Sequence, residues 1–130
     1  MSAGLALVIL GLAMLQIKHF ICDFVIQTPF QYLNKGIYGH PGGFIHAGLH
    51  ALGSFAPVLW LTANPALAAV IVGAEFVIHY HIDWSKEQIN HRLKISYGDA
   101  LYWIVFGADQ FMHQITYIVM IVLLARAGNL

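Results

Sequence analysis

The hydrophobic positions of the chain gather into four long segments, separated by short polar or glycine-rich stretches. A helix needs about 20 mainly apolar residues to cross a bilayer, and the segments reach or approach that length. They predict spanning helices over residues 3–27, 44–61, 66–83 and 99–125. The pattern therefore predicts an all-α fold, in which residues 1–130 form a single integral membrane domain built as a bundle of four transmembrane helices.

The stretches between the segments carry residues that end and begin helices. Pro29 is expected to stop the first segment, and the glycines and Pro41 that follow make residues 28–43 a loop. Asn64 and Pro65 suit the N-cap and the first residue of the third helix.

A separate short helix is predicted between the third and fourth spanning helices. Ser85-Lys-Glu-Gln88 matches a capping box, in which a serine and a glutamine three residues later cap a helix start. We expect residues 86–95 to form this interfacial helix at the membrane surface, with Ile89 and Leu93 facing inward.

One polar stripe interrupts the third apolar segment. Glu75, His79 and Asp83 are spaced i, i+4, so they share one helix face. Ionisable groups in hydrocarbon are costly and usually have a partner or a task. The other segments each carry a pair with the same spacing: His19 and Asp23, His46 and His50, Asp109 and His113.

These pairs are expected to converge near one membrane face. At 1.5 Å per residue, all of them fall within roughly 5–20 Å of the side that holds loops 28–43 and 84–98. The lysines and arginines of the loops favour a cytoplasmic position for both loops, which leaves both termini outside.

The composition also supports metal binding. The chain has eight histidines against six lysines and arginines, and a formal net charge of zero gives no sign of nucleic-acid binding. Imidazole with carboxylate suits zinc, iron or manganese, and we expect one or two divalent ions, with zinc as the first choice. The predicted ligands are His19, Asp23, His46, His50, His79, Asp83, Asp109 and His113. Nothing in the sequence defines an oligomeric state.

Two further residues are predicted to act in catalysis. Glu75 lies one turn deeper than His79 and suits a ligand, an orienting carboxylate or a general base. Lys86 suits either an anion-binding group or a membrane anchor.

The remaining polar and aromatic residues have simpler interpretations. Lys18 is expected to reach toward lipid headgroups, and Tyr80 to lie in an interfacial aromatic belt. His81 is expected to point away from His79. Solvated surface positions are expected for His40 and His91, packing for Cys22, and supporting hydrogen bonds for Gln27 and Gln110.

The combined motifs resemble a known family. They are His19-x3-Asp23-Phe24-x2-Gln27-Thr28, Lys35, His46-x3-His50, His79-x3-Asp83-Trp84-x-Lys86 and Asp109-Gln110-x2-His113. This pattern is similar to that of a bacterial membrane family labelled domain of unknown function 3307. The resemblance implies a small multi-pass protein encoded by bacteria or their phages, and an inner-membrane location. A looser similarity to membrane-bound metal-dependent hydrolases implies a hydrolytic activity.

Three functions are therefore carried forward. The first is a metal-dependent hydrolase acting in the lipid bilayer on a lipid-like or membrane-delivered substrate. The second is a proton or metal transporter, which would need polar residues in the other leaflet, where residues 5–15 and 118–124 are almost wholly apolar. The third is a non-catalytic structural or regulatory protein whose polar core fixes helix register.

Overall fold

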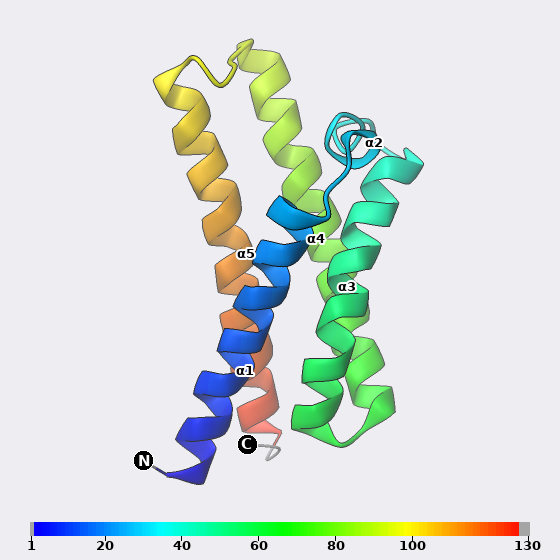
Figure 1. Cartoon of the computed structure of the whole chain (residues 1–130), viewed down its shortest axis with the longest axis vertical. Helices are drawn as coiled ribbons and strands as arrows, with labels where there is room; N and C mark the ends of the chain where they lie inside the picture. Colours follow the sequence, from blue (N-terminus) through cyan, green and yellow to red (C-terminus); the bar gives the residue numbers. More distant parts are fainter. Residues whose placement is uncertain (1, 128–130) are drawn as a thin grey trace.

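The computed structural model describes residues 2–127, and every regular element within them is helical. Figure 1 shows a bundle of long helices, with the start of α1 and the end of α5 at the end opposite the short helix α2. The elements are α1 (Ala3–Phe20), η1 (Ile21–Val25), α2 (Pro29–Tyr32), α3 (Pro41–Thr62), α4 (Pro65–Leu93) and α5 (Ala100–Arg126). Four helices are long and apolar enough to cross a membrane, which confirms the predicted fold class.

Local sequence explains where the helices start. The Asn64 side chain accepts hydrogen bonds from the backbone N–H groups of Ala66 and Leu67, and Pro65 is the first residue of α4, as predicted. The α3 helix begins in the same way, because the His40 side chain accepts from the Gly42 N–H and Pro41 follows it. His40 thus caps a helix instead of lying free in a loop.

The separate interfacial helix predicted at residues 86–95 is wrong. The α4 helix runs without a break through Ser85 and ends only at Leu93, where Lys94 takes the left-handed conformation with φ 53°. Residues 84–93 contain no glycine or proline, so nothing in them stops the helix. Asn90 is buried, and Ile89 and Leu93 are exposed, which reverses the predicted faces.

The first helix ends earlier than predicted. The α1 helix gives way to the π-helical turn η1, closed by a hydrogen bond from the Ile26 N–H to the Ile21 carbonyl, and regular helix does not reach Gln27. Thr28 is extended, as expected for a residue before proline.

The long helices form a closed ring of neighbours. The α1 helix packs against α3 and α5, and α4 packs against the same two helices. The half of the bundle near the chain ends has an apolar core that includes Leu15, Val58, Ile121 and Leu124. The half near α2 holds the polar residues instead, so the bundle is divided into an apolar part and a polar part.

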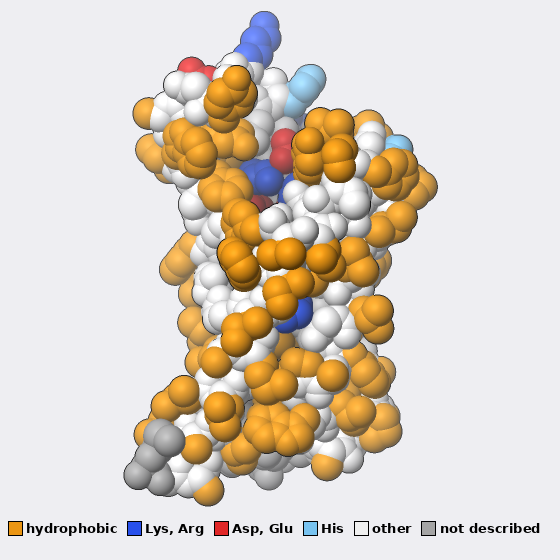
Figure 2. All heavy atoms as spheres, viewed as in Figure 1, with side chains coloured by type: hydrophobic (Ala, Val, Ile, Leu, Met, Phe, Trp, Pro, Cys, Tyr) orange, Lys and Arg blue, Asp and Glu red, His pale blue; other side chains and the backbone are white. Residues whose placement is uncertain are grey.

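The outer surface is largely apolar, as Figure 2 shows for one face. Leu52, Val70 and Ile104 have 71%, 69% and 66% of their surface exposed. In water such exposure would be costly, but lipid solvates these side chains. The four apolar helices and this surface fit a multi-pass membrane protein.

Candidate metal centre

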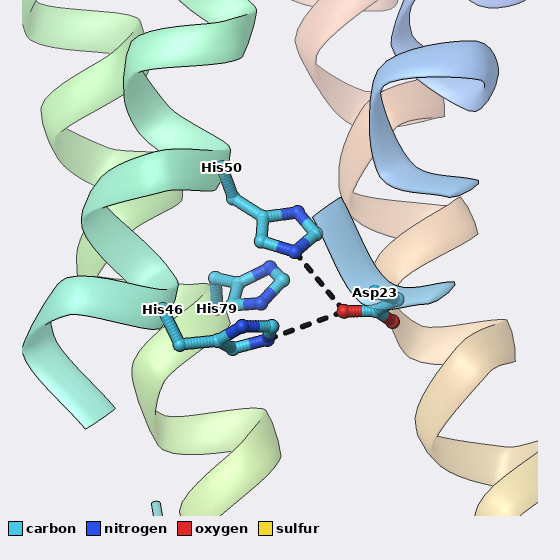
Figure 3. Close-up of side chains that lie close together, drawn as sticks. All are labelled: Asp23, His46, His50 and His79. Atoms are coloured by element: carbon cyan, nitrogen blue, oxygen red, sulfur yellow. Dashed lines mark hydrogen bonds and ion pairs between the residues drawn. The ribbon is translucent and has the colours of Figure 1, made fainter. Parts of the chain in front are cut away.

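The first candidate ligand group joins three parts of the chain. Asp23 comes from the π-helical turn, His46 and His50 from successive turns of α3, and His79 from α4. Figure 3 shows the four side chains pointing toward one another across the bundle. One ligand atom from each lies within 4.8 Å of those of the others. Three imidazoles and one carboxylate match the ligand number of a tetrahedral zinc site.

The π-helical turn sets the position of Asp23. Its Oδ1 atom lies 3.0 Å from His50 Nε2 and 3.2 Å from His46 Nε2. Turns of this type are rare and are frequent at functional sites, because the wider turn redirects a side chain. The irregular end of α1 therefore places a carboxylate between two histidines of a neighbouring helix.

A second group lies beside the first. His79, Asp83 and His113 also offer ligand atoms within 4.8 Å of one another. Asp109 adjoins them, with its Oδ1 atom 3.6 Å from His113 Nε2. His79 belongs to both groups. Each imidazole nitrogen binds one ion. His79 would therefore bind two ions only if each of its two nitrogens held a different one.

Buried polar atoms that lack a hydrogen bond support a metal in this cluster. His79 is 1% exposed, and among the described residues neither of its ring nitrogens makes a hydrogen bond, although its Nε2 atom lies 3.4 Å from Asp83 Oδ2. His50 Nδ1 and His113 Nε2 are also buried without a hydrogen bond, and Asp83 Oδ2 has only the imidazole Nε2 atoms of His46 and His79 near it, at 3.1 and 3.4 Å. An unsatisfied buried polar atom costs about 1–3 kcal/mol, and coordination of a cation removes that cost. Imidazole and carboxylate donors suit zinc, iron or manganese.

His19 lies beside the cluster but in neither ligand group. Its Nδ1 atom is 2.9 Å from the Tyr117 hydroxyl, and its Nε2 atom is 2.9 Å from the Gln110 amide oxygen. The amide oxygen only accepts, so Nε2 carries the proton and Nδ1 accepts from Tyr117. His19 Nε2 is also 3.1 Å from Asp23 Oδ2, so His19 holds Asp23 while both of its nitrogens are engaged with the protein.

Gln110 and Gln27 support the same cluster with hydrogen bonds. The Gln110 amide N–H donates to Asp23 Oδ2 at 3.0 Å, which agrees with the amide orientation inferred from His19. Gln27 Nε2 lies 3.2 Å from His46 Nδ1. Both glutamines therefore act as the sequence predicted.

Lys18 is buried inside the bundle, so its predicted position at the headgroups is wrong. Its ammonium donates to Glu75 Oε1 at 2.7 Å and to the Tyr117 hydroxyl at 3.0 Å. Tyr117 links this pair to His19. The predicted catalytic residue Glu75 therefore pairs with Lys18 and belongs to neither ligand group.

Two more lysines reach the cluster from the α2 end of the bundle. Lys35 donates to Asp83 Oδ1 at 3.1 Å. Lys86 Nζ lies 3.0 Å from Glu87 Oε1 and 3.9 Å from Asp109 Oδ2. Lys86 is buried, which excludes the membrane-anchor interpretation in this conformation.

The other sequence predictions have mixed outcomes. Tyr80 is buried and its hydroxyl accepts from the Gly39 N–H, so its predicted belt position is wrong. Cys22 is buried, as predicted. His81 is exposed and contacts the Val77 carbonyl, away from the cluster, and His91 is also exposed.

Lys18 and Tyr117 are the site neighbours that the sequence analysis missed. Tyr117 follows His113 by four residues and extends the stripe that starts at Asp109, so its spacing was visible in the sequence. The buried position of Lys18 was harder to predict from the sequence. The only indication was a second charged residue, Glu75, in another apolar segment, with which Lys18 could pair.

A family model matches residues 11–129, and its description is "Protein of unknown function (DUF3307)". This range covers both ligand groups and the lysines around them. No match was found among the curated proteins or among the solved structures.

Proposed function

Because the chain belongs to this family of unknown function, whose description assigns no activity, we propose from the site itself that the protein is a membrane-embedded metal-dependent hydrolase. Its substrate would be lipid-borne or delivered through the membrane. The observation that carries the proposal is the convergence of Asp23 with His46, His50 and His79. In this group His50 Nδ1 and both ring nitrogens of His79 are buried without a hydrogen bond.

Some residues would bind the ion, and others would orient its carboxylate ligands. His46, His50, His79 and Asp23 would hold one ion, and Asp83 and His113 would hold a second or complete the first site. A bound transition metal supplies a water with a lowered pKa and polarises the scissile bond. His19 and Gln110 fix Asp23, and Lys35 fixes Asp83, so the carboxylates are oriented by the protein.

The end of the polar chain supports a hydrolase over a transporter. From His19 the polar contacts continue through Tyr117 and Lys18 to Glu75. Beyond them the described helices pack as an apolar core around Leu15, Val58 and other aliphatic side chains. A conducting path needs polar groups through both leaflets, whereas a hydrolytic site needs access from only one side.

Metal analysis is the experiment that tests the metal site. Purified protein in nanodiscs should contain one or two equivalents of zinc per chain, with iron and manganese as the alternatives. His50→Ala combined with His79→Ala removes two imidazoles and should lower the metal content to below about a tenth. The measurement is elemental analysis by mass spectrometry.

His91→Ala is the matched control, because His91 lies on the same helix as His79 and is exposed. It should leave the metal content unchanged. Wild-type protein that neither contains nor takes up zinc, iron or manganese would contradict the metal site.

Hydrolysis is tested separately with metal-loaded protein. The test compounds are carboxylic esters, phosphoesters and amides, each in a lipid-linked and a soluble form. We expect the protein to cleave at least one of them. Cleavage should stop on chelation and in the His79→Ala variant. Metal-loaded protein that cleaves none of them would favour a structural or transport role.

A further inference from the structure

A pocket of about 340 Å³ opens beside the candidate metal centre. Asp23, Asp109 and Gln110 line it on the side of the ligand cluster, and Lys35 and Lys86 also line it. Figure 2 shows basic and acidic side chains inside a hollow between apolar ridges near the α2 end of the molecule. The volume lies within the usual range for a small-ligand site, about 300–1,000 Å³.

The two lysines are unusual because they are buried while they face this pocket. Lys35 is 6% exposed and Lys86 is 7% exposed. Burying an ammonium group is costly unless its donors are used, so two buried ammonium groups at one pocket need an explanation. Their long side chains could otherwise reach the water with little strain.

Protein carboxylates use only part of the donor capacity of these lysines. An ammonium group has three N–H donors. Lys35 has one hydrogen bond to a carboxylate, at Asp83, and of the two carboxylates near Lys86 only Glu87 is within hydrogen-bond distance. Each lysine therefore keeps donors for a group inside the pocket.

The charge balance allows an anionic ligand once the cluster holds metal, and favours one when two ions are bound. The pocket side of the cluster has the carboxylates of Asp23, Asp83, Asp109 and Glu87 against the two lysines. Each divalent ion bound by the cluster adds two positive charges, so the occupied site would be neutral or positive. The carbonyl oxygen of a neutral ester or amide offers the ammonium donors one uncharged acceptor, whereas an anion with several oxygens can accept from both lysines through charged oxygens.

We propose that this pocket is a phosphate-binding subsite, in which Lys35 and Lys86 hold the phosphoryl oxygens of a phosphate ester against the metal centre. The inference rests on the proposed hydrolase function and names its substrate class. In the corresponding reaction a water oxygen bonds to phosphorus and the bond from phosphorus to the alcohol oxygen breaks. One proton of the water goes to the leaving alcohol oxygen, and the products are inorganic phosphate and the alcohol.

The walls of the pocket suit an apolar portion of the same molecule. Phe24 and Leu33 line the pocket and are exposed, and Phe106 and Tyr102 line it from α5. The Lys86 ammonium also lies 5.9 Å from the centre of the Phe106 ring, within cation–π range. The phosphate ester could therefore be a lipid headgroup or a soluble ester with an apolar group, and the shared chemistry is the phosphoryl group.

The test measures the affinity of inorganic phosphate for the purified protein by isothermal titration calorimetry, with and without added zinc. Lys86→Gln removes the charge and should weaken phosphate binding by about 10- to 100-fold, because hydrogen bonds to charged groups are the strong ones. Lys94→Gln, an exposed lysine one residue beyond the same helix, is the matched control and should bind as the wild type does. Lys86→Arg keeps the charge and should retain most of the affinity.

The metal content of each variant is measured on the same samples, so the two proposals fail separately. Unchanged phosphate affinity in Lys86→Gln with normal metal content overturns the subsite and leaves the metal centre standing. A wild-type protein that binds no phosphate in either condition also overturns the subsite. Absence of metal contradicts the hydrolase, whereas lysine-dependent phosphate binding without metal still supports the subsite.

Two arms distinguish the sources of the phosphate. Phosphatidic acid in nanodiscs and soluble glycerol phosphate compete against inorganic phosphate, with phosphatidylcholine nanodiscs as the reference. Stronger competition by phosphatidic acid identifies a lipid phosphate, and stronger competition by glycerol phosphate identifies a soluble ester. Failure of both to compete contradicts a phosphate-ester substrate.

Discussion

At the scale of single residues, the buried Lys18–Glu75 pair is the least expected contact of this protein. Both side chains are almost wholly buried, and their N–O distance is 2.7 Å. A buried ion pair adds little net stability, but removal of one partner leaves a charge without compensation. Since Tyr117 joins Lys18 to His19, the pair also holds the hydrogen-bond chain that ends at Asp23.

Glu75→Gln should destabilise the protein strongly. The Lys18 ammonium would then stay buried without its carboxylate, so the free energy of unfolding should fall by about 3–5 kcal/mol. Unfolding by SDS in mixed micelles measures this change. Lys18→Met combined with Glu75→Met should lose less stability than Glu75→Gln alone, because no charge is left buried.

Glu87→Gln is the control, since the Glu87 side chain is 30% exposed, and its effect should stay within about 1 kcal/mol. A Glu75→Gln protein as stable as the wild type would mean that Lys18 has another partner. The predicted catalytic role of Glu75 is tested on the same variant, by assaying hydrolysis under conditions in which it remains folded.

At the scale of secondary-structure elements, the contact of α1 with α3 brings Asp23 to the histidines. Gly53 on α3 packs against the aliphatic part of Lys18, where an added Cβ atom would lie 2.6 Å from Lys18 Cγ. Gly73 on α4 has open space around the corresponding position. Alanine substitutions at these two positions therefore distinguish the effect of the tight contact at Gly53 from the general effect of replacing glycine with alanine in a helix.

Gly53→Ala and Gly73→Ala form a matched pair. Gly73→Ala should raise the free energy of unfolding by about 0.5–1 kcal/mol, because alanine is more favourable than glycine in the interior of a helix. Gly53→Ala should lower it by about 1–3 kcal/mol and reduce metal content, because the overpacked contact moves α1 away from α3. SDS unfolding and metal analysis provide both measurements. Equal effects of the two substitutions would show that the helix contact at Gly53 is not tight.

At the scale of the whole molecule, the bundle separates an apolar half from a polar half. The start of α1 and the end of α5 lie at the apolar end, and α2 lies at the polar end (Figure 1). The α4 helix has 29 residues and is roughly 44 Å long, which exceeds the roughly 30 Å hydrocarbon core. Because most of the polar residues of α4 lie in its last turns, we expect these turns to extend beyond the hydrocarbon on the side of the pocket.

We predict that this pocket side faces the cytoplasm in a bacterial inner membrane, since four of the six lysines and arginines, Lys35, Lys86, Arg92 and Lys94, belong to that end of the chain's helices and loops. With Cys22 buried, single cysteines report on each side. A membrane-impermeant maleimide should label Arg126→Cys in intact spheroplasts, and Lys94→Cys only after permeabilisation. The reverse labelling pattern would invert the topology, and labelling of wild-type protein controls for Cys22.

The sequence was sufficient for the existence of the four apolar helices and for most of the residues that meet in the cluster. Apolar length defined the spanning segments, and i, i+4 spacing placed each His/carboxylate pair on one helix face. Both signals depend only on residues close together in the sequence, so they can be interpreted without knowing how the helices pack. The predicted interfacial helix failed because a capping-box pattern also fits a helix interior when no residue ends the helix before it.

Tertiary structure decided what the local pattern leaves open: which side chains meet. His19, predicted as a ligand, instead has both nitrogens engaged by Tyr117 and Gln110 from α5, and Lys18 and Lys35 find carboxylates on α4. These contacts depend on the ring order of the helices and on the π-helical turn at Asp23, which helix periodicity does not encode. The sequence by itself determined a membrane bundle with its polar pairs at one end, because burial and helix period act along the chain. Only the packing of the helices decided which of those polar groups remain available to bind an ion.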